Sequence, residues 1–190
     1  MMKEIRWHGR GGQGAKTVSE LVALALMHHG YFVQAFPEYG PERSGAPLQA
    51  YTRSSDEPIR LHCGVTDPDL VVVLDDSLLH EIRVTEGLKP EGFILVNTKK
   101  TKEALRLQLG FDGTLYCINA DKIAVETGLL YSNVVMAGAL GGILGNPPLE
   151  DLKRAAEEFL SIKLSPKIVE INLKAIEAGF RESQHMEELA

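Results

Sequence analysis

Residues 5–17 decide the fold and read Ile5-Arg6-Trp7-His8-Gly9-Arg10-Gly11-Gly12-Gln13-Gly14-Ala15-Lys16-Thr17. Ile5 and Trp7 alternate with polar residues, which is typical of a strand. The glycines that follow match the Gly-x-Gly-x-x-Gly spacing of a tight turn between a strand and a helix. Over residues 15–29 the apolar residues recur with the spacing of one helix face. The stretch therefore predicts the strand, turn and helix that open an α/β domain.

This glycine loop predicts a site for an anion. Glycines let the backbone approach a phosphate closely, and the start of the following helix offers free N–H groups and a partial positive charge. Lys16 and Thr17 would add a cation and a hydroxyl group on the first helical turn.

The pattern leaves the identity of the anion open. A nicotinamide dinucleotide site would usually place an acidic residue at the end of the second strand, where residues 34–36 read Gln-Ala-Phe and Glu38 comes slightly late. A P-loop fails by one residue, because Ala15 separates Gly14 from Lys16. A tight turn that binds nothing is the third interpretation.

The rest of the chain alternates predicted strands with predicted helices. Strands are expected at residues 31–36, 70–74, 93–96 and 114–118, and helices at 101–109, 119–126, 134–144, 149–160 and 166–178. Residues 37–47 hold too many prolines and glycines for regular structure. Residues 48–53 and 59–61 suggest a hairpin, which would be an antiparallel excursion near residues 48–62.

These elements predict an α/β protein with three layers, α/β/α, around a largely parallel sheet. We expect one domain over residues 1–181 and a mobile tail over residues 182–190. The helix at 134–144 is apolar on nearly every side and carries three glycines, so it should be buried and closely packed.

Composition excludes several classes of function. The chain of 190 residues has 26 acidic and 20 basic residues, a net charge of −6, and no cluster of Lys and Arg that could follow a phosphate backbone, so no nucleic acid is expected. No apolar run is long enough to span a membrane and the start lacks the apolar core of a signal peptide, which predicts a cytoplasmic protein without a membrane partner.

The reactive residue types also exclude some chemistry. Cys63 and Cys117 are the two cysteines, whereas an iron–sulfur cluster normally needs four thiolates, so any cluster must lie on another chain. The histidines show no metal-ligand spacing, and no Ser-His-Asp or Cys-His signature is present. Asp75 and Asp76 follow a buried strand, where a site could use them, but a capping role with Ser77 is the preferred interpretation. We predict no metal and no catalytic residue.

Two motifs together resemble a known family. Residues 6–17 are the first, and residues 36–47, Phe-Pro-Glu-Tyr-Gly-Pro-Glu-Arg-Ser-Gly-Ala-Pro, are the second. They resemble the gamma subunit of pyruvate (or 2-oxoisovalerate):ferredoxin oxidoreductase. The likeness extends over nearly the whole chain, and residues 65–69 and 133–136 support it.

The resemblance implies a role within a larger enzyme. Partner alpha, beta and ferredoxin-like delta subunits would hold thiamine diphosphate and iron–sulfur clusters, with ferredoxin as the electron acceptor of the complex. The gamma chain would be non-catalytic and would help bind coenzyme A during oxidative decarboxylation of a 2-oxoacid, with pyruvate favoured. Carried over by position, the contacts are Gly11, Gly12, Gln13, Gly14 and Thr17 in the loop, with Arg43 and Ser44 opposite.

Two alternatives to this role stay open. One is a free-standing nucleotide-dependent dehydrogenase, and the other is a purely structural subunit without a ligand.

Overall fold

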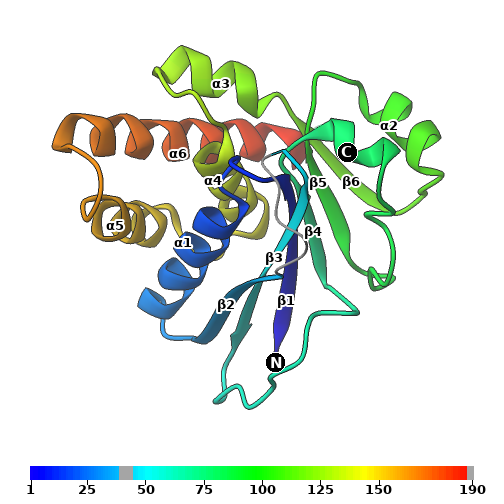
Figure 1. The fold of residues 1–190 in the computed structure, drawn as a ribbon, viewed down its shortest axis with the longest axis horizontal. Coiled ribbons are helices and arrows are strands. Elements are labelled where there is room, and N and C mark those ends of the chain that lie inside the picture. Colours follow the sequence, from blue (N-terminus) through cyan, green and yellow to red (C-terminus); the bar gives the residue numbers. More distant parts are fainter. Residues whose placement is uncertain (39–44, 188–190) are drawn as a thin grey trace.

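The computed structural model describes residues 1–38 and 45–187, which form one six-stranded sheet with helices on both faces (Figure 1). The strand order is β2-β3-β1-β4-β5-β6. The strands are β1 (Lys3–Arg10), β2 (Phe32–Glu38), β3 (Pro47–Ser55), β4 (Leu70–Val73), β5 (Phe93–Asn97) and β6 (Thr114–Ile118). All six predicted strand regions other than 59–61 are therefore confirmed.

The antiparallel excursion is confirmed, but its predicted partner is wrong. β3 is antiparallel to both β1 and β2, whereas β1, β4, β5 and β6 run parallel. Residues 59–61 form no strand. β1 occupies one edge of β3 and β2 occupies the other, so no edge remains for a hairpin with residues 59–61. The predicted β-α-β unit consequently has β3 inserted between its two strands.

The helices confirm the three layers. They are α1 (Ala15–His28), α2 (Lys102–Leu109), α3 (Ala120–Thr127), α4 (Asn133–Leu144), α5 (Leu149–Leu160) and α6 (Pro166–Glu187), with a 3₁₀ helix η1 (Asp76–His80). The larger core cluster joins one face of the sheet to α1 and α3 to α6. The smaller cluster joins the other face of β4, β5 and β6 to α2 and the segment that follows η1. The second helical layer therefore covers only half of the sheet.

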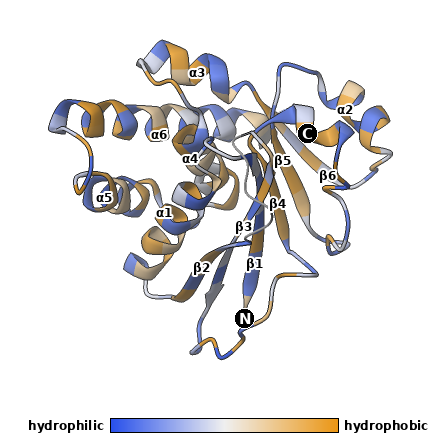
Figure 2. Cartoon of the chain, viewed as in Figure 1, coloured by the Kyte–Doolittle hydropathy of each residue, from blue (hydrophilic) through white to orange (hydrophobic). Residues whose placement is uncertain are grey.

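The central strands are hydrophobic on both faces, as the sequence predicts for parallel strands between two layers. Every residue of β4 and β5 is buried, and Figure 2 shows hydrophobic colouring along β5 and β6. Among the described residues, no helix is long and apolar enough to cross a membrane.

α4 packs against α6 at close range because its glycines leave room for backbone. A Cβ on Gly138 would lie 2.0 Å from the carbonyl oxygen of Ile176, and one on Gly142 would lie 2.1 Å from Ser183 Oγ. This confirms the expected close approach. α6 is longer than predicted, because Ser183 is fully buried and Met186 packs against the core. Residues 182–187, which we assigned to a tail, are therefore helical.

Candidate functional site

The glycine loop joins the end of β1 to the start of α1 through backbone conformations that favour glycine. Gly12 has φ 95° and Gly14 has φ 79°, both in the left-handed region. Gly9 is needed for a different reason, since a Cβ there would lie 3.2 Å from both Ala15 Cβ and Leu74 Cδ1. The loop is thus pressed against the end of β4.

α1 begins in a way that suits an anion. Gly14 is its N-cap, and no side chain caps the helix. The first backbone bond of the helix runs from Val18 N–H to Gly14 O, at 2.9 Å. The preceding N–H groups of the first turn carry the partial positive charge of the helix and have no side-chain acceptor.

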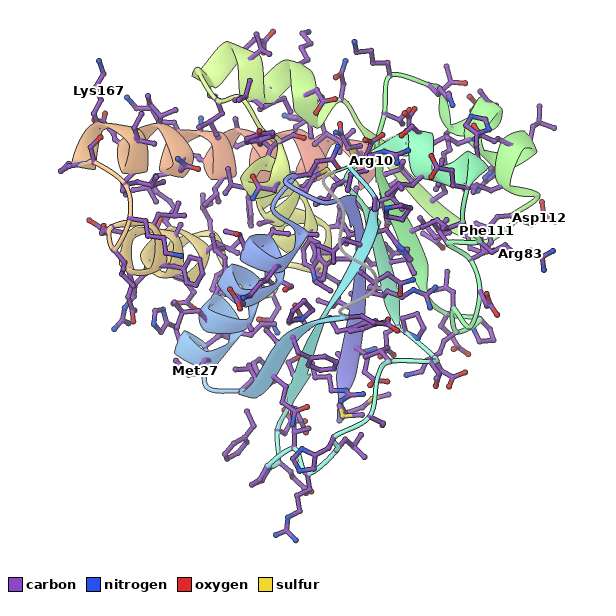
Figure 3. All side chains as sticks on the ribbon, viewed as in Figure 1. Arg10, Met27, Arg83, Phe111, Asp112 and Lys167 are labelled. Atoms are coloured by element: carbon purple, nitrogen blue, oxygen red, sulfur yellow. The ribbon has the colours of Figure 1, made fainter. Side chains whose placement is uncertain are left out.

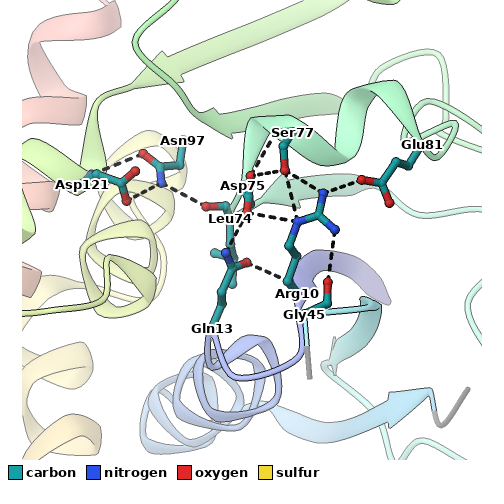
Figure 4. A network of polar contacts seen from close by, with 9 residues as sticks. All are labelled: Arg10, Gln13, Gly45, Leu74, Asp75, Ser77, Glu81, Asn97 and Asp121. Atoms are coloured by element: carbon teal, nitrogen blue, oxygen red, sulfur yellow. Dashed lines mark hydrogen bonds and ion pairs between the residues drawn. The ribbon is translucent and has the colours of Figure 1, made fainter. Parts of the chain in front are cut away.

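Gln13 ties this loop to the end of β4 (Figure 4). Its Oε1 accepts from the backbone N–H of Arg10 at 2.7 Å, and its Nε2 donates to Asp75 Oδ2 at 2.7 Å. Both ends of the side-chain amide are therefore engaged within the protein. Gln13 was predicted as a ligand contact, and the structure shows it bracing the loop at the edge of a cleft.

Arg10 connects four segments, a role that no pattern in the sequence indicated. Its guanidinium donates to Ser77 Oγ at 2.7 and 3.1 Å, to Glu81 Oε1 at 2.5 Å and to the carbonyl oxygen of Gly45 at 3.1 Å, and its Nε lies 3.3 Å from Asp75 Oδ2. The hydrogen bond from Arg10 lowers the pKa of Glu81. The signal that could have revealed this role was the presence of an arginine within the glycine loop and of Asp75 directly after β4.

The two motifs that carry the family resemblance meet in space. The backbone N–H of Gly11 donates to Ala46 O at 2.9 Å, and the N–H of Gly45 donates to Gly11 O at 3.2 Å. The glycine loop and the end of the second motif therefore form a short backbone ladder. Arg43 and Ser44 lie outside the described residues.

A cleft of about 520 Å³ opens beside Gln13 at the carboxyl edge of the parallel strands. This edge is where α/β sheets bind ligands. The residues that line the cleft are Gln13, Leu74, Asp75, Asp76, Asn97, Thr98, Lys99, Lys100, Asp121, Leu130, Tyr131 and Ser132.

The floor of the cleft is a fixed hydrogen-bond network. Buried Asn97 donates from Nδ2 to Leu74 O at 2.9 Å and to Asp121 Oδ1 at 2.8 Å, and Ser132 Oγ donates to the same Asp121 oxygen at 2.7 Å. Figure 4 shows that this network lies next to the contacts of Gln13 and Asp75. The floor is thus preorganised and polar.

The rim of the cleft differs from its floor. Lys99 and Lys100 are exposed on one side. Leu130 and Tyr131 are 83% and 53% exposed, which leaves two apolar side chains facing solvent. The rim therefore combines cations with an apolar surface.

Asp75 stays ionised in this setting. Burial raises the pKa of its carboxyl group, but hydrogen bonds from Ser77 and Gln13 and the charge of Arg10 outweigh burial and lower it. Its Oδ1 accepts from Ser77 N at 3.0 Å at the start of η1, which confirms the capping role predicted for it.

The predicted site residues divide between two cavities. Gln13 lines the cleft, whereas Thr17 lines a separate cavity of about 350 Å³ together with Lys16 and Asn133. No local pattern in the sequence indicated the polar floor or the lysines of the rim. Among the described residues, no group of three or more His, Cys, Asp or Glu side chains is arranged to hold a metal ion.

The fold and the cleft define an α/β protein with an anion-ready glycine loop at the carboxyl edge of its sheet. Comparison with known proteins gives the family. Residues 4–182 match the family described as pyruvate ferredoxin/flavodoxin oxidoreductase. The chain belongs to this family, as a gamma-type subunit of a 2-oxoacid:ferredoxin oxidoreductase, and the resemblance inferred from the two motifs is confirmed.

Individual relatives match over nearly their whole length. Pyruvate synthase subunit PorC of Thermotoga maritima is 42% identical over 94% of this chain and 93% of its own. The pyruvate/ketoisovalerate oxidoreductases common subunit gamma of Thermococcus kodakarensis is 44% identical over 96% of this chain and 97% of its own. The crystal structure of the Thermotoga maritima subunit superposes with a TM-score of 0.84 at 39% identity, over 95% of this chain and 96% of that one.

Proposed function

We propose that this chain contributes part of the coenzyme A site of its oxidoreductase and takes no direct part in the redox chemistry. The observation that carries the proposal is the glycine loop, which leads from Gln13 at the edge of the cleft to an uncapped helix start. Coenzyme A combines a diphosphate, a further phosphate, an adenine ring and a long polar arm. The phosphates and the adenine ring have candidate partners here.

The loop fits the diphosphate. Helix starts bind phosphates through free backbone N–H groups. If Gly12 carried a Cβ, no atom of the described residues would lie within 4 Å of it. A phosphate could occupy this open space next to Gly12. Gly12 and Gly14 are the backbone contacts we assign, with Gln13 holding the loop in place. The N–H of Gly11 is already donated to Ala46 O, so Gly11, predicted as a contact, is assigned to the support of the loop.

The rim fits the remaining parts of the ligand. Lys99 can pair with a phosphate, and an aromatic ring can stack on Tyr131. Lys100 Nζ already donates to Gln108 Oε1 at 2.9 Å and lies 3.6 Å from Asp76 Oδ2, so it would have to leave these partners to bind a phosphate.

Thr17 lines the cavity that it shares with Lys16 and Asn133, and not the cleft. We therefore assign Thr17 to the side of the bound diphosphate that faces away from the cleft. Arg43 and Ser44 remain predictions from the sequence.

The substrate and the redox groups belong to partner subunits in this proposal. Two cysteines cannot hold a cluster in the usual four-thiolate manner. The Thermococcus kodakarensis relative is named a subunit common to pyruvate and ketoisovalerate oxidoreductases, which favours a gamma chain that does not select the 2-oxoacid. We assign the 2-oxoacid pocket, thiamine diphosphate and the clusters to alpha, beta and delta subunits, with pyruvate as the favoured substrate and the cytoplasm as the location.

A more distant structure directs attention to the same ligand. The 2-oxoglutarate:ferredoxin oxidoreductase of Magnetococcus marinus, solved with 2-oxoglutarate, coenzyme A and succinyl-CoA, contains this fold in 31% of its chain, at 19% identity and a TM-score of 0.73. At that identity the likeness is one of fold alone. It makes coenzyme A the first ligand to test.

A purely structural role is the second candidate, and one observation favours it. The polar groups of Gln13 are satisfied within the protein, so the loop is braced without a ligand. Equilibrium titration of coenzyme A into the assembled enzyme separates the two functions. The proposal expects Gly12→Val to weaken binding in enzyme of normal subunit composition, and unchanged binding would favour the structural role.

A further inference from the structure

The opposite face of the sheet carries a second polar cavity that is separate from the cleft. Arg6 and His8 alternate along β1 with Ile5 and Trp7, which lie in the core under α1, so the two polar side chains lie on the other face. The core cluster under α2 includes no residue of β1. Arg6, His8, Gln49 and Ile82 are among the residues that line a cavity of about 410 Å³, and none of its lining residues belongs to the cleft.

His8 presents a buried donor without an acceptor. The side chain is 2% exposed, and its Nε2 accepts from Arg6 Nε at 3.0 Å, so the ring proton of the neutral imidazole is on Nδ1. His8 Nδ1 has no hydrogen-bond partner among the described residues. Burial, followed by the charge of Arg6, lowers the pKa of His8 to about 3, so the ring stays neutral. Buried polar groups are nearly always satisfied, and an orphan of this kind indicates a missing partner.

Arg6 places a buried positive charge beside His8. It is 6% exposed, and its Nη2 donates to Val84 O at 2.9 Å and to Glu86 O at 2.6 Å. Within the part of the chain that the structure describes, no carboxylate forms an ion pair with it. Burial lowers the pKa of Arg6, and the charges of Glu86 and Glu38 only partly offset this effect. A buried charge that is not directly paired is unfavourable. One anion with an acceptor oxygen would satisfy both Arg6 and His8.

We propose that this cavity binds a small carboxylate, which accepts a hydrogen bond from His8 Nδ1 and neutralises the charge of Arg6. A monoanion fits better than a phosphate dianion. Two guanidinium groups, of Arg6 and Arg83, and the carboxylate of Glu86 line the cavity, which leaves a single positive charge. The neutral imidazole adds a donor without adding charge. The site does not depend on the proposed coenzyme A role.

The direct test observes the His8 ring in the full chain. The chain is labelled with ¹⁵N-histidine, and the Nδ1–H resonance is followed during titration with acetate and, separately, with phosphate and chloride at matched ionic strength. The proposal expects a saturable shift of this resonance with acetate and none with phosphate or chloride.

Two variants connect the shift to the cavity. Ile82→Phe fills the cavity but keeps Arg6 and His8, and should weaken acetate binding about ten-fold or more. Lys167→Ala removes an exposed cation at the start of α6, on the opposite side of the molecule from Arg83 (Figure 3), and should leave binding unchanged. If Ile82→Phe does not fold, Thr66→Trp blocks the same cavity from a residue that is exposed.

Three results would overturn the proposal. The first is an Nδ1–H resonance that acetate does not move, which would mean that the cavity holds water alone. The second is an equal response to phosphate and acetate, which would indicate a general anion effect. The third is acetate binding that survives when a folded variant has filled the cavity.

Discussion

Gln13 donates from Nε2 to Asp75 Oδ2 at 2.7 Å, and this contact joins the glycine loop to the carboxyl end of β4. The two residues are 62 positions apart in the sequence. The contact links the loop to the wall of the cleft, so a change at either residue should affect both the stability of the loop and the ligand site.

Replacing Gln13 by Glu should destabilise the protein at neutral pH. The new carboxylate would face the ionised Asp75, so a hydrogen bond becomes a like-charge contact, at a cost of about 1–3 kcal/mol. The repulsion should raise the pKa of Asp75, and the loss should shrink as the pH falls and one carboxylate takes up a proton. Urea denaturation of the full chain over a range of pH measures this. Gln13→Ala is the control, because it loses only the hydrogen bond that lowers the pKa of Asp75 and adds no second carboxylate, so its loss should shrink less on acidification. Identical pH profiles for the two variants would argue against the contact.

Replacing Arg10 by Lys should make the glycine loop less rigid. A lysine keeps the charge but cannot contact Ser77, Glu81 and Gly45 together, because it lacks the planar fork of the guanidinium. We expect faster amide exchange at Gly11, whose N–H bonds to Ala46. Exchange measured by NMR checks this, with Arg154→Lys on the surface of α5 as the control. Unchanged protection of Gly11 in Arg10→Lys would contradict the bracing role.

His8 should make the protein less stable as the pH falls. Its pKa is about 3 in the folded chain against an ordinary value of 6.5, so below pH 6.5 the unfolded state binds the proton first. Stability should therefore decline from about pH 6.5 towards pH 3, with at most about 1.4 kcal/mol per pH unit from this residue. His8→Gln, whose oxygen can accept from Arg6, should remove this part of the slope. The exposed His185→Gln should keep it, and equal slopes in all three proteins would contradict a buried neutral His8.

The sequence predicted features that depend on local pattern and missed those that depend on pairing. The helix at 134–144 was correctly expected to be buried and closely packed, because an apolar surface on all sides with glycines leaves few other possibilities. The partner of β3 was wrong, because alternation defines a strand but does not specify which edge it joins.

The site shows the same limit. The loop residues follow from a local motif, whereas Asn97 and Asp121 reach the floor of the cleft from separate elements. Thr17 shows that a local motif does not specify the cavity that a side chain faces, since Thr17 lines a different cavity from Gln13.

The isolated chain should be colourless and inactive. It is expected to reduce no ferredoxin-like acceptor when supplied with pyruvate and thiamine diphosphate, because the proposal assigns clusters and catalytic groups to the partner subunits. Absorbance spectra and acceptor reduction assays check this, with the assembled enzyme as the positive control. Pyruvate-dependent reduction by this chain alone would contradict the division of labour proposed above.

The central claim is that the glycine loop binds coenzyme A, and a matched pair of glycines tests it. Gly12 and Gly30 both have a left-handed φ, 95° and 98°, and neither has a described atom within 4 Å of an added Cβ. Valine therefore imposes a similar backbone strain at each position, but only Gly12 lies at the proposed diphosphate.

The decisive measurement is the KM for coenzyme A in assembled enzyme of verified subunit stoichiometry, with the KM for the 2-oxoacid measured beside it. We expect Gly12→Val to raise the KM for coenzyme A about ten-fold or more, which corresponds to the loss of a charge-assisted contact. Gly30→Val should leave that constant near the parent value, and the KM for the 2-oxoacid should stay unchanged in both variants. A Gly12→Val enzyme that assembles normally and uses coenzyme A like the parent would contradict the assignment.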